Sequence, residues 1–123
     1  FSTSVSPAPY THPTKEYITG RWTDALASGV TVVGKVPNTT TVREILWDGA
    51  TIDIDHADAR AGLAQVADAV SRWTPAQGEQ QIRQALQHLD WRHRFVQLCE
   101  AMGDVPASLT ADCEAMRAQY VQH

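Results

Sequence analysis

The sequence predicts an α/β protein, with a partial Rossmann-like parallel sheet of about three strands, flanking helices and a helical C-terminal tail. Two observations predict this class. Apolar runs rich in β-branched residues alternate with helical patterns in the first half of the chain, whereas the second half holds helical periodicity alone. We therefore expect residues 1–74 to form the α/β part and residues 75–123 to form a helical tail that packs on it.

The first elements are expected before residue 37. Residues 1–5 are read as a short strand, and residues 7–14 must form a loop because they hold three prolines. A helix is predicted over residues 20–28, and Gly29 follows it where a positive φ costs little. Residues 29–36, GVTVVGKV, are apolar without alternation. That pattern is typical of a strand buried on both faces of a parallel sheet.

A second helix and strand follow. Thr41 and Glu44 are spaced as a capping box, which predicts a short helix through TVREILW that ends at Asp48 and Gly49. Residues 50–55, ATIDID, alternate isoleucine with aspartate, so we expect a strand nearer the edge of the sheet.

Four helices are predicted in the second half. The first begins after Asp58, and the second begins at Thr74-Pro75, where Gln77 stands three residues after Thr74. The third begins at Asp90 and ends at Gly103, and the fourth begins before Leu109. The apolar residues expected on their inner faces are Leu63, Val66, Ala67, Val70 and Trp73; Ile82, Ala85, Leu86 and Leu89; Trp91, Phe95, Leu98, Cys99 and Met102; and Leu109, Cys113, Met116 and Tyr120.

Composition excludes several classes of function. The net charge is −4 and the basic residues are scattered, so we expect no nucleic-acid partner. The longest apolar run, residues 30–33, is too short to span a bilayer, and no signal peptide is read at the start, so a cytoplasmic setting is expected. Cys99 and Cys113 lack metal-ligand spacing and are expected as buried free thiols. The chain begins without Met, as if it were a fragment of a longer protein.

The stretch KEYITGRWTD contains the candidate site. In open α/β sheets, ligands bind where loops enter helices at the carboxyl ends of strands. The free N–H groups of a helix start favour an anion, which Thr19, Gly20 and Arg21 would approach. Glu16 and Asp24 stand on either side of this start, and ionised carboxylates suit paired sugar hydroxyls. A nucleotide-sugar, with phosphates in the middle and hydroxyls at both ends, would satisfy all five residues.

These residues resemble a known family. Glu16 and Asp24 are spaced as the Glu-x7-Glu motif of the group 1 glycosyltransferases with the GT-B fold, with Asp in the last place. DALASG is similar to the family's E-A-(L/M)-A-x-G, VTVVGKVP to its next strand, and QALQHLDWRHRF to a late helix. The resemblance covers roughly residues 12–100.

The resemblance implies a C-terminal, donor-binding part of a sugar transferase. By position, Glu16 would contact the transferred sugar as the catalytic acid of the motif, and Asp24 would contact the ribose. The amides of Thr19 and Gly20 would lie near the donor phosphates. The donor is a substrate, and we expect neither a cofactor nor a metal. Transfer is expected to be retaining, and the acceptor is unknown.

The sequence also departs from the family. Asp24 is one methylene shorter than Glu, and ITGRW replaces the family's Gly-Leu-Pro. The family's acceptor domain and the basic residues that neutralise the diphosphate precede this region. The 123-residue chain alone is therefore expected to be inactive.

Simpler interpretations stand beside this one. Glu16 and Asp24 would then be solvated acids, with Arg21 paired to Asp24 on the helix surface. Stacking of Tyr10 or Tyr17 on a base is the less favoured interpretation, and His12 is expected to be exposed.

The remaining rings are assigned structural roles. The tryptophans are expected in the core, with Trp22 the one candidate for base stacking, and His88 and His93 are expected at the surface.

The alternative function is a non-catalytic α/β module that uses its helical tail, residues 75–123, to pack on a partner protein or on a second copy of itself. In that case changes at Phe95 or Leu98 would abolish association, provided that both side chains are exposed.

Overall fold

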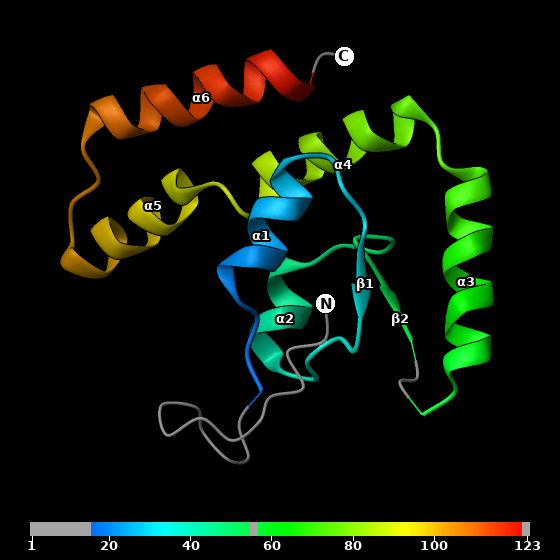
Figure 1. The fold of residues 1–123 in the computed structure, drawn as a ribbon. Coiled ribbons are helices and arrows are strands. Elements are labelled where there is room, and N and C mark those ends of the chain that lie inside the picture. Colours follow the sequence, from blue (N-terminus) through cyan, green and yellow to red (C-terminus); the bar gives the residue numbers. More distant parts are fainter. Residues whose placement is uncertain (1–15, 55–56, 122–123) are drawn as a thin grey trace.

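The computed structural model describes residues 16–54 and 57–121, with side chains up to Ala118, as a mostly helical α/β fold around a small parallel sheet (Figure 1). Its elements are α1 (Gly20–Ala27), β1 (Val32–Gly34), α2 (Thr40–Ile45), β2 (Thr51–Asp53), α3 (Ala59–Arg72), α4 (Pro75–His88), α5 (Trp91–Met102) and α6 (Ala107–Val121). The strand expected at residues 1–5 lies outside the described residues, as do Tyr10, His12 and the side chain of Tyr120.

The sheet consists of β1 and β2, which run parallel with Val33 opposite Ile52 and Gly34 opposite Asp53. Parallel neighbours need a crossover connection, and α2 provides it. Both strands are shorter than expected. After β1, the N–H of Val36 bonds to the Asp53 carboxylate at 3.0 Å instead of continuing the ladder.

Burial of β1 also differs from expectation, because Val32 and Val33 are only partly buried and Val30 is exposed. The prediction of a strand buried on both faces is therefore wrong for the fold described.

The core lies where α1 packs on β1 and α4. Leu26 is fully buried, and Trp22 is buried with its ring beside Gly34. At the end of α1, Gly29 has φ +79°, and a Cβ there would lie 2.9 Å from the carbonyl oxygen of Gly78 on α4. The two glycines thus allow α1 and α4 to approach closely. Because Trp22 is buried, it cannot stack on a nucleotide base, so the candidate role of Trp22 in base stacking is wrong.

Most helix starts agree with the sequence signals. The carboxylate of Asp58 accepts from Ala61 N–H at 2.9 Å, and the side chain of Gln77 accepts from Thr74 N–H at 2.7 Å. Gly103 ends α5 in the left-handed conformation, with φ +90°.

The start of α2 differs from the prediction. Thr39 caps it by accepting from Val42 N–H at 3.2 Å, so the capping box expected at Thr41 is wrong. Three consecutive threonines follow Asn38, and the first of them in the chain serves as the cap.

His88 and His93 are partly buried and have specific contacts, so the surface positions expected for these two histidines are wrong. The ring of His88 stacks on Trp47, with centroids 5.8 Å apart. His93 Nε2 lies 3.0 Å from the carbonyl oxygen of Leu86. A carbonyl only accepts, so Nε2 carries a proton and donates.

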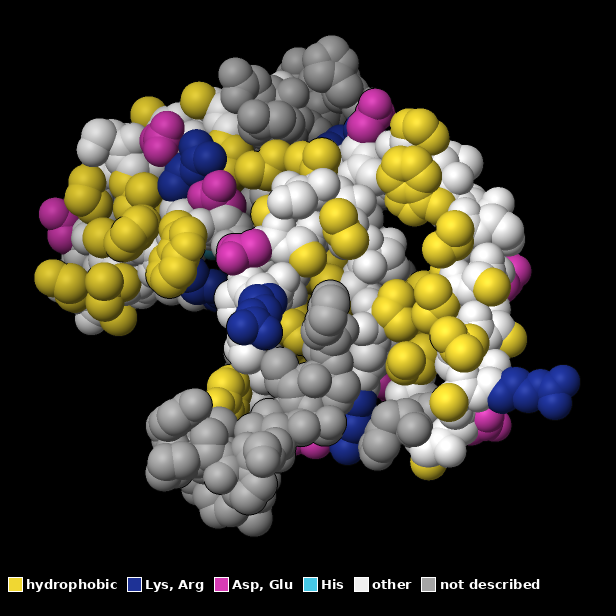
Figure 2. All heavy atoms as spheres, in the orientation of Figure 1, with side chains coloured by type: hydrophobic (Ala, Val, Ile, Leu, Met, Phe, Trp, Pro, Cys, Tyr) yellow, Lys and Arg dark blue, Asp and Glu magenta, His cyan; other side chains and the backbone are white. Residues whose placement is uncertain are grey.

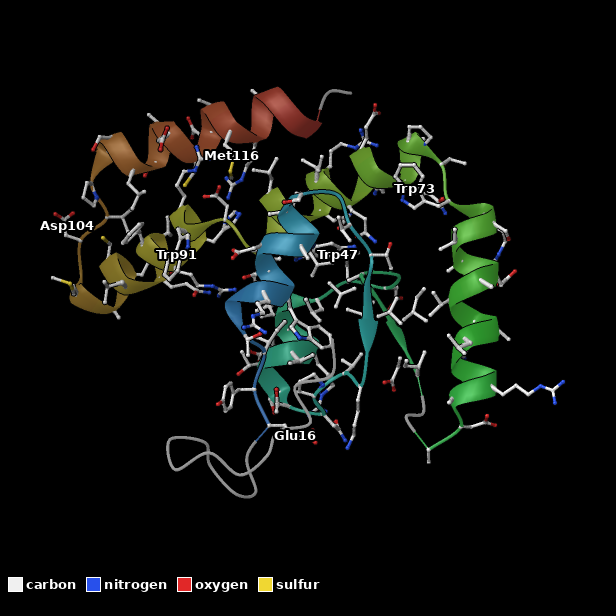
Figure 3. The ribbon with its side chains drawn as sticks, viewed as in Figure 1. Glu16, Trp47, Trp73, Trp91, Asp104 and Met116 are labelled. Carbon is white, nitrogen blue, oxygen red and sulfur yellow. The ribbon has the colours of Figure 1, made fainter. Side chains whose placement is uncertain are left out.

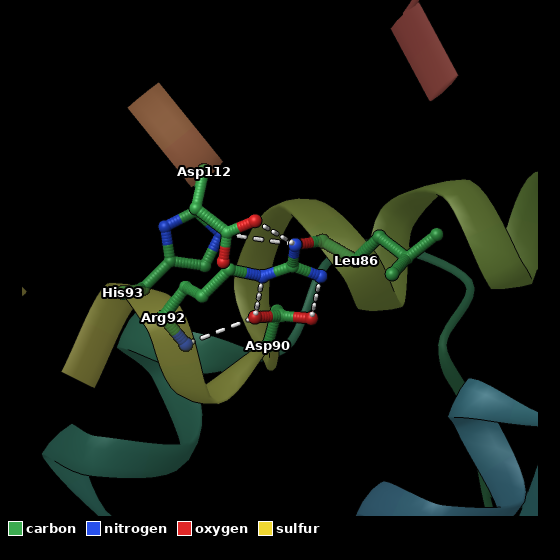
Figure 4. Close-up of polar contacts among 5 residues, drawn as sticks. All are labelled: Leu86, Asp90, Arg92, His93 and Asp112. Carbon is green, nitrogen blue, oxygen red and sulfur yellow. Dashed lines mark hydrogen bonds and ion pairs between the residues drawn. The ribbon is translucent and has the colours of Figure 1, made fainter. Parts of the chain in front are cut away.

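Helices α5 and α6 pack on each other, and α6 also contacts α4. Among the described side chains of α6, Cys113 and Met116 are buried. Both cysteines are free thiols, as expected, but Cys99 is only partly buried, so the prediction of burial is confirmed for Cys113 alone. Asp90 caps α5 and holds the Arg92 guanidinium through two bonds, of 2.8 and 3.0 Å (Figure 4). Arg92 also lies 3.7 Å from Asp112 on α6.

Several apolar side chains expected in the core are exposed, so those predictions are wrong. They are Leu63, Ala67, Val70 and Trp73 on or beside α3, Ile82 on α4, and Trp91, Phe95, Leu98 and Met102 on α5. Helix α3 stands apart beyond β2 (Figure 1), and Figure 2 shows hydrophobic side chains gathered over α5 and beside α3. Helical periodicity predicts that a face is apolar, but it does not say what covers that face.

In the part of the chain that the structure describes, no helix is both long and apolar enough to cross a membrane.

Candidate functional site

The candidate site lies at the carboxyl edge, by which we mean the ends of β1 and β2 at Gly34 and Asp53 together with loop 35–38. Both strands end at this edge because they are parallel. Helix α1 lies antiparallel to β1, because Trp22, near the start of the helix, contacts Gly34 at the end of the strand. The N-terminus of α1 therefore lies at the carboxyl edge, where ligands bind in open α/β sheets.

Glu16 joins the carboxyl edge from the segment before α1 (Figure 3). Its Oε2 accepts from the N–H of Asn38 at 3.1 Å, and its Oε1 lies 3.4 Å from Lys35 Nζ. The hydrogen bond from Asn38, followed by the contact with Lys35, holds the pKa of Glu16 below its ordinary value. Glu16 is therefore ionised at neutral pH, as a role in binding sugar hydroxyls requires.

Two further side chains hold the same loop. Asp53, at the end of β2, accepts from the N–H of Val36. Arg43 on α2 donates to Asn38 Oδ1 at 2.6 Å and to Thr40 Oγ1 at 3.4 Å. The loop is thus fixed by side chains from the chain before α1, from α2 and from β2.

The start of α1 carries the other expected residues. Thr19 is its N-cap by backbone conformation, yet its side chain makes no cap hydrogen bond. The first-turn amides, those of Gly20 and Arg21, thus receive no side-chain acceptor from the cap residue. Gly20 is exposed, and a Cβ there would lie 4.0 Å from Asp24 Oδ2. The carboxylate of Asp24 therefore leans back toward the helix start.

Arg21 and Asp24 are both exposed, and within residues 16–54 and 57–121 no ion pair joins them. The surface pair considered for them is thus not formed. Tyr17, just before α1, is 53% exposed. The Arg21 guanidinium and the Asp24 carboxylate are consequently open to a ligand.

Four residues of this site are not predicted from the sequence: Lys35, Asn38, Arg43 and Asp53. The available signal was position, because polar residues directly after parallel strands meet at one edge. Among the described residues, no group of three or more His, Cys, Asp or Glu side chains is arranged to hold a metal ion.

Comparison with known proteins adds no assignment: no family model, curated protein or solved structure matches the chain.

Proposed function

We propose that the chain is the nucleotide-sugar-binding part of a glycosyltransferase similar to the group 1 enzymes with the GT-B fold. One observation carries the proposal: Glu16 and the start of α1 lie together at the carboxyl edge of a parallel strand pair. The Rossmann-like sheet of this proposal has about three strands.

Each residue has a role in this proposal. Glu16 contacts the transferred sugar, since a carboxylate that holds two donors still has lone pairs for hydroxyls. Asp24 accepts from the ribose hydroxyls. The amides at Thr19 and Gly20 face the phosphates at the positive end of the α1 dipole, and Arg21 adds a charge-assisted bond.

The proposed reaction moves a sugar from its nucleotide diphosphate to an acceptor, with retention of configuration. Positioning of the donor and stabilisation of the leaving diphosphate supply most of the rate. The protein works in the cytoplasm, and neither a metal nor a cofactor takes part in the reaction. The acceptor domain belongs to a longer native chain. The 123-residue chain therefore binds donor without turning it over.

Calorimetric titration of the chain with UDP, GDP and their sugar conjugates tests the proposal. We expect one nucleotide to bind, and Glu16→Ala and Asp24→Ala to weaken binding of its sugar conjugate. Glu114→Ala is the matched control, because Glu114 is an exposed acid on α6. Circular dichroism checks that each variant folds. Equal affinity in the two acid variants and the control would contradict the assigned roles.

A second candidate function is self-association through α5. Four large apolar side chains, which we name the α5 stripe, are each at least half exposed: Trp91 (74%), Phe95 (52%), Leu98 (56%) and Met102 (77%). Exposed apolar patches of this kind are typical of interaction surfaces. The condition set for the alternative function, exposure of Phe95 and Leu98, is therefore met.

We propose a second copy of the chain as the partner of the α5 stripe. The spacing of the four residues, four then three then four, reads the same in both directions. A two-fold pair of antiparallel α5 helices would thus place Trp91 on Met102 of the second copy and Phe95 on Leu98 of the second copy. Sulfur–aromatic contact and opposed helix dipoles favour this arrangement.

Sedimentation equilibrium over about 10 to 500 µM chain tests association at the weak affinity expected of one helix pair. Leu98→Glu is expected to give monomer throughout. Leu63→Glu, at a leucine on α3 that is also more than half exposed, is the control and is expected to keep the wild-type behaviour. A wild-type chain that stays monomeric over the whole range would exclude this candidate.

A further inference from the structure

Lys35 is a cation at the carboxyl edge to which no role has been given. It follows Gly34 directly, at the end of β1, and its side chain is 60% exposed. A diphosphate is multiply charged, so a site for it needs charge-assisted donors as well as neutral amides. The question is which cation at this edge is free to supply them.

The backbone of loop 35–38 cannot serve as the anion site. The N–H of Val36 donates to Asp53 Oδ1. The N–H of Asn38 donates to Glu16 Oε2, and that of Thr39 donates to a carbonyl within the loop. A nest for phosphate requires successive unpaired N–H groups, and these three are already used. Any contribution of loop 35–38 to anion binding, in addition to the amides at the start of α1, therefore depends on its side chains.

Arg43 is not available without cost to the loop. Its guanidinium donates to Asn38 Oδ1 at 2.6 Å and to Thr40 Oγ1. Asn38 in turn binds Glu16 through its N–H. Turning Arg43 toward a ligand would release the loop that Glu16 holds.

Lys35 is held far more loosely. Among the residues that the structure describes, its one ion pair is with Glu16 at 3.4 Å, between side chains that are 60% and 47% exposed. Exposed pairs of this kind contribute little to stability, and the flexible lysine stem lets Nζ move by rotation alone. Glu16 keeps its bond to Asn38 when Lys35 leaves. The exchange of a carboxylate for a phosphate therefore disturbs nothing else at the edge.

We propose that Lys35 binds the diphosphate of the nucleotide donor and that Glu16 positions it. Glu16 keeps the ammonium at the carboxyl edge in the absence of ligand, and Lys35 moves from Glu16 to a phosphate oxygen on binding. This inference rests on the proposed function and adds to it a phosphate-binding residue from the loop after β1.

The test compares nucleotide with nucleoside on the whole chain, using UDP with uridine and GDP with guanosine, by calorimetry and by NMR titration for the weaker nucleosides. Lys35→Met is expected to lower diphosphate affinity about tenfold or more and to leave nucleoside affinity unchanged. Lys35→Arg is expected to restore most of the loss. Arg117→Met, at an exposed residue of α6, is the control for removing one positive charge.

A double-mutant cycle tests the positioning role of Glu16. Glu16→Gln keeps an acceptor for Asn38 N–H but removes the charge that holds Lys35. Because the ligand then no longer has to displace Glu16 from Lys35, we expect this variant to strengthen diphosphate binding in the wild-type background and to have no such effect in the Lys35→Met background. A purely structural role for Glu16 would instead give the same loss of affinity in both backgrounds.

The outcomes separate the two proposals. If a nucleotide binds and Lys35→Met binds it as tightly as wild type, the inference is wrong and the proposed function stands. If neither UDP nor GDP binds the wild-type chain at millimolar concentration, the proposed function fails and the inference fails with it.

Discussion

Trp47 donates its indole Nε1–H to Oε1 of Gln81 at 2.8 Å, which ties the segment between α2 and β2 to α4. The amide of Gln81 also donates from Nε2 to the carbonyl oxygen of Gly49 at 2.8 Å. Gln81 is the buried polar side chain of the described core, 8% exposed. One side chain thus joins α4 to two residues of the turn before β2, Trp47 and Gly49.

Gln81→Leu is expected to destabilise the chain by about 2 to 4 kcal/mol, because it leaves the Trp47 donor and the Gly49 acceptor unpaired in a partly buried place. Urea unfolding followed by circular dichroism measures the change. Gln87→Leu, at an exposed glutamine of the same helix, is the control and is expected to cost little. Equal stability of the two variants would show that the bonds of Gln81 contribute nothing beyond packing.

Gly29→Ala is expected to cost about 3 kcal/mol or more, because φ is +79° and the new Cβ would meet a backbone oxygen of Gly78 at 2.9 Å. Gly103→Ala is a control for the conformational part alone, since φ is +90° there and nothing lies within 4 Å of the Cβ position. That variant is expected to cost about 1 to 2 kcal/mol. A similar loss at both sites would mean that α4 yields to the extra methyl group.

The local signals that were predicted correctly are those in which a residue and its neighbours in sequence interact. Asp58, Gln77 and Gly103 act within one turn of their helices, so the sequence contains both partners of each contact. The start of α2 was placed too late because Thr39 and Thr41 offer the same cap chemistry, and sequence alone does not rank them.

The wrong predictions concern burial, which depends on contacts distant in sequence. Trp73 and Trp91 lie on apolar faces, yet they are 50% and 74% exposed, because α3 stands apart and α5 meets α6 with another face. In the candidate site, the spacing of Glu16 and Asp24 predicts Glu16 as a site residue. Its bond to Asn38, 22 residues away, had no sequence signal.

Asp90→Asn is expected to remove a pH-dependent part of the stability. The hydrogen bonds from the Arg92 guanidinium hold the pKa of Asp90 below its ordinary value in the folded state. Ionised Asp90 therefore stabilises the fold above about pH 4, and this contribution is lost as the pH falls through the folded pKa. We expect the variant to be less stable than wild type by about 1 kcal/mol at pH 7, and the difference to shrink at lower pH.

Urea unfolding at several pH values between about 7 and 2.5 measures this difference. The variant keeps a good cap residue, so loss of the bond to Arg92 dominates. Asp104→Asn, at an exposed acid after α5, serves as the control. A difference at Asp90 that stays constant with pH would contradict the role of its charge.

Asp24 is expected to recognise the ribose of the bound nucleotide. A hydrogen bond to an ionised carboxylate contributes about 1.5 to 3 kcal/mol, so Asp24→Ala should weaken binding of the nucleoside diphosphate about tenfold or more. Asp24→Glu should bind at least as tightly as wild type, because its longer side chain matches the motif that the sequence resembles. Asp104→Ala is the control, since that acid is exposed and distant in sequence from the site.

The 2′-deoxy form of the same nucleotide makes the test of Asp24 specific. If the carboxylate accepts from the ribose 2′-hydroxyl, wild type will bind the deoxynucleotide more weakly, and Asp24→Ala will bind both forms alike. The deoxynucleotide leaves the Asp24 carboxylate without its hydroxyl partner, which lowers the affinity for that form. Removing the carboxylate therefore removes the preference for the ribose form. If Asp24→Ala still distinguishes the two nucleotides as wild type does, ribose recognition belongs to another residue, and the paired acids of the sequence do not act as the resemblance implies.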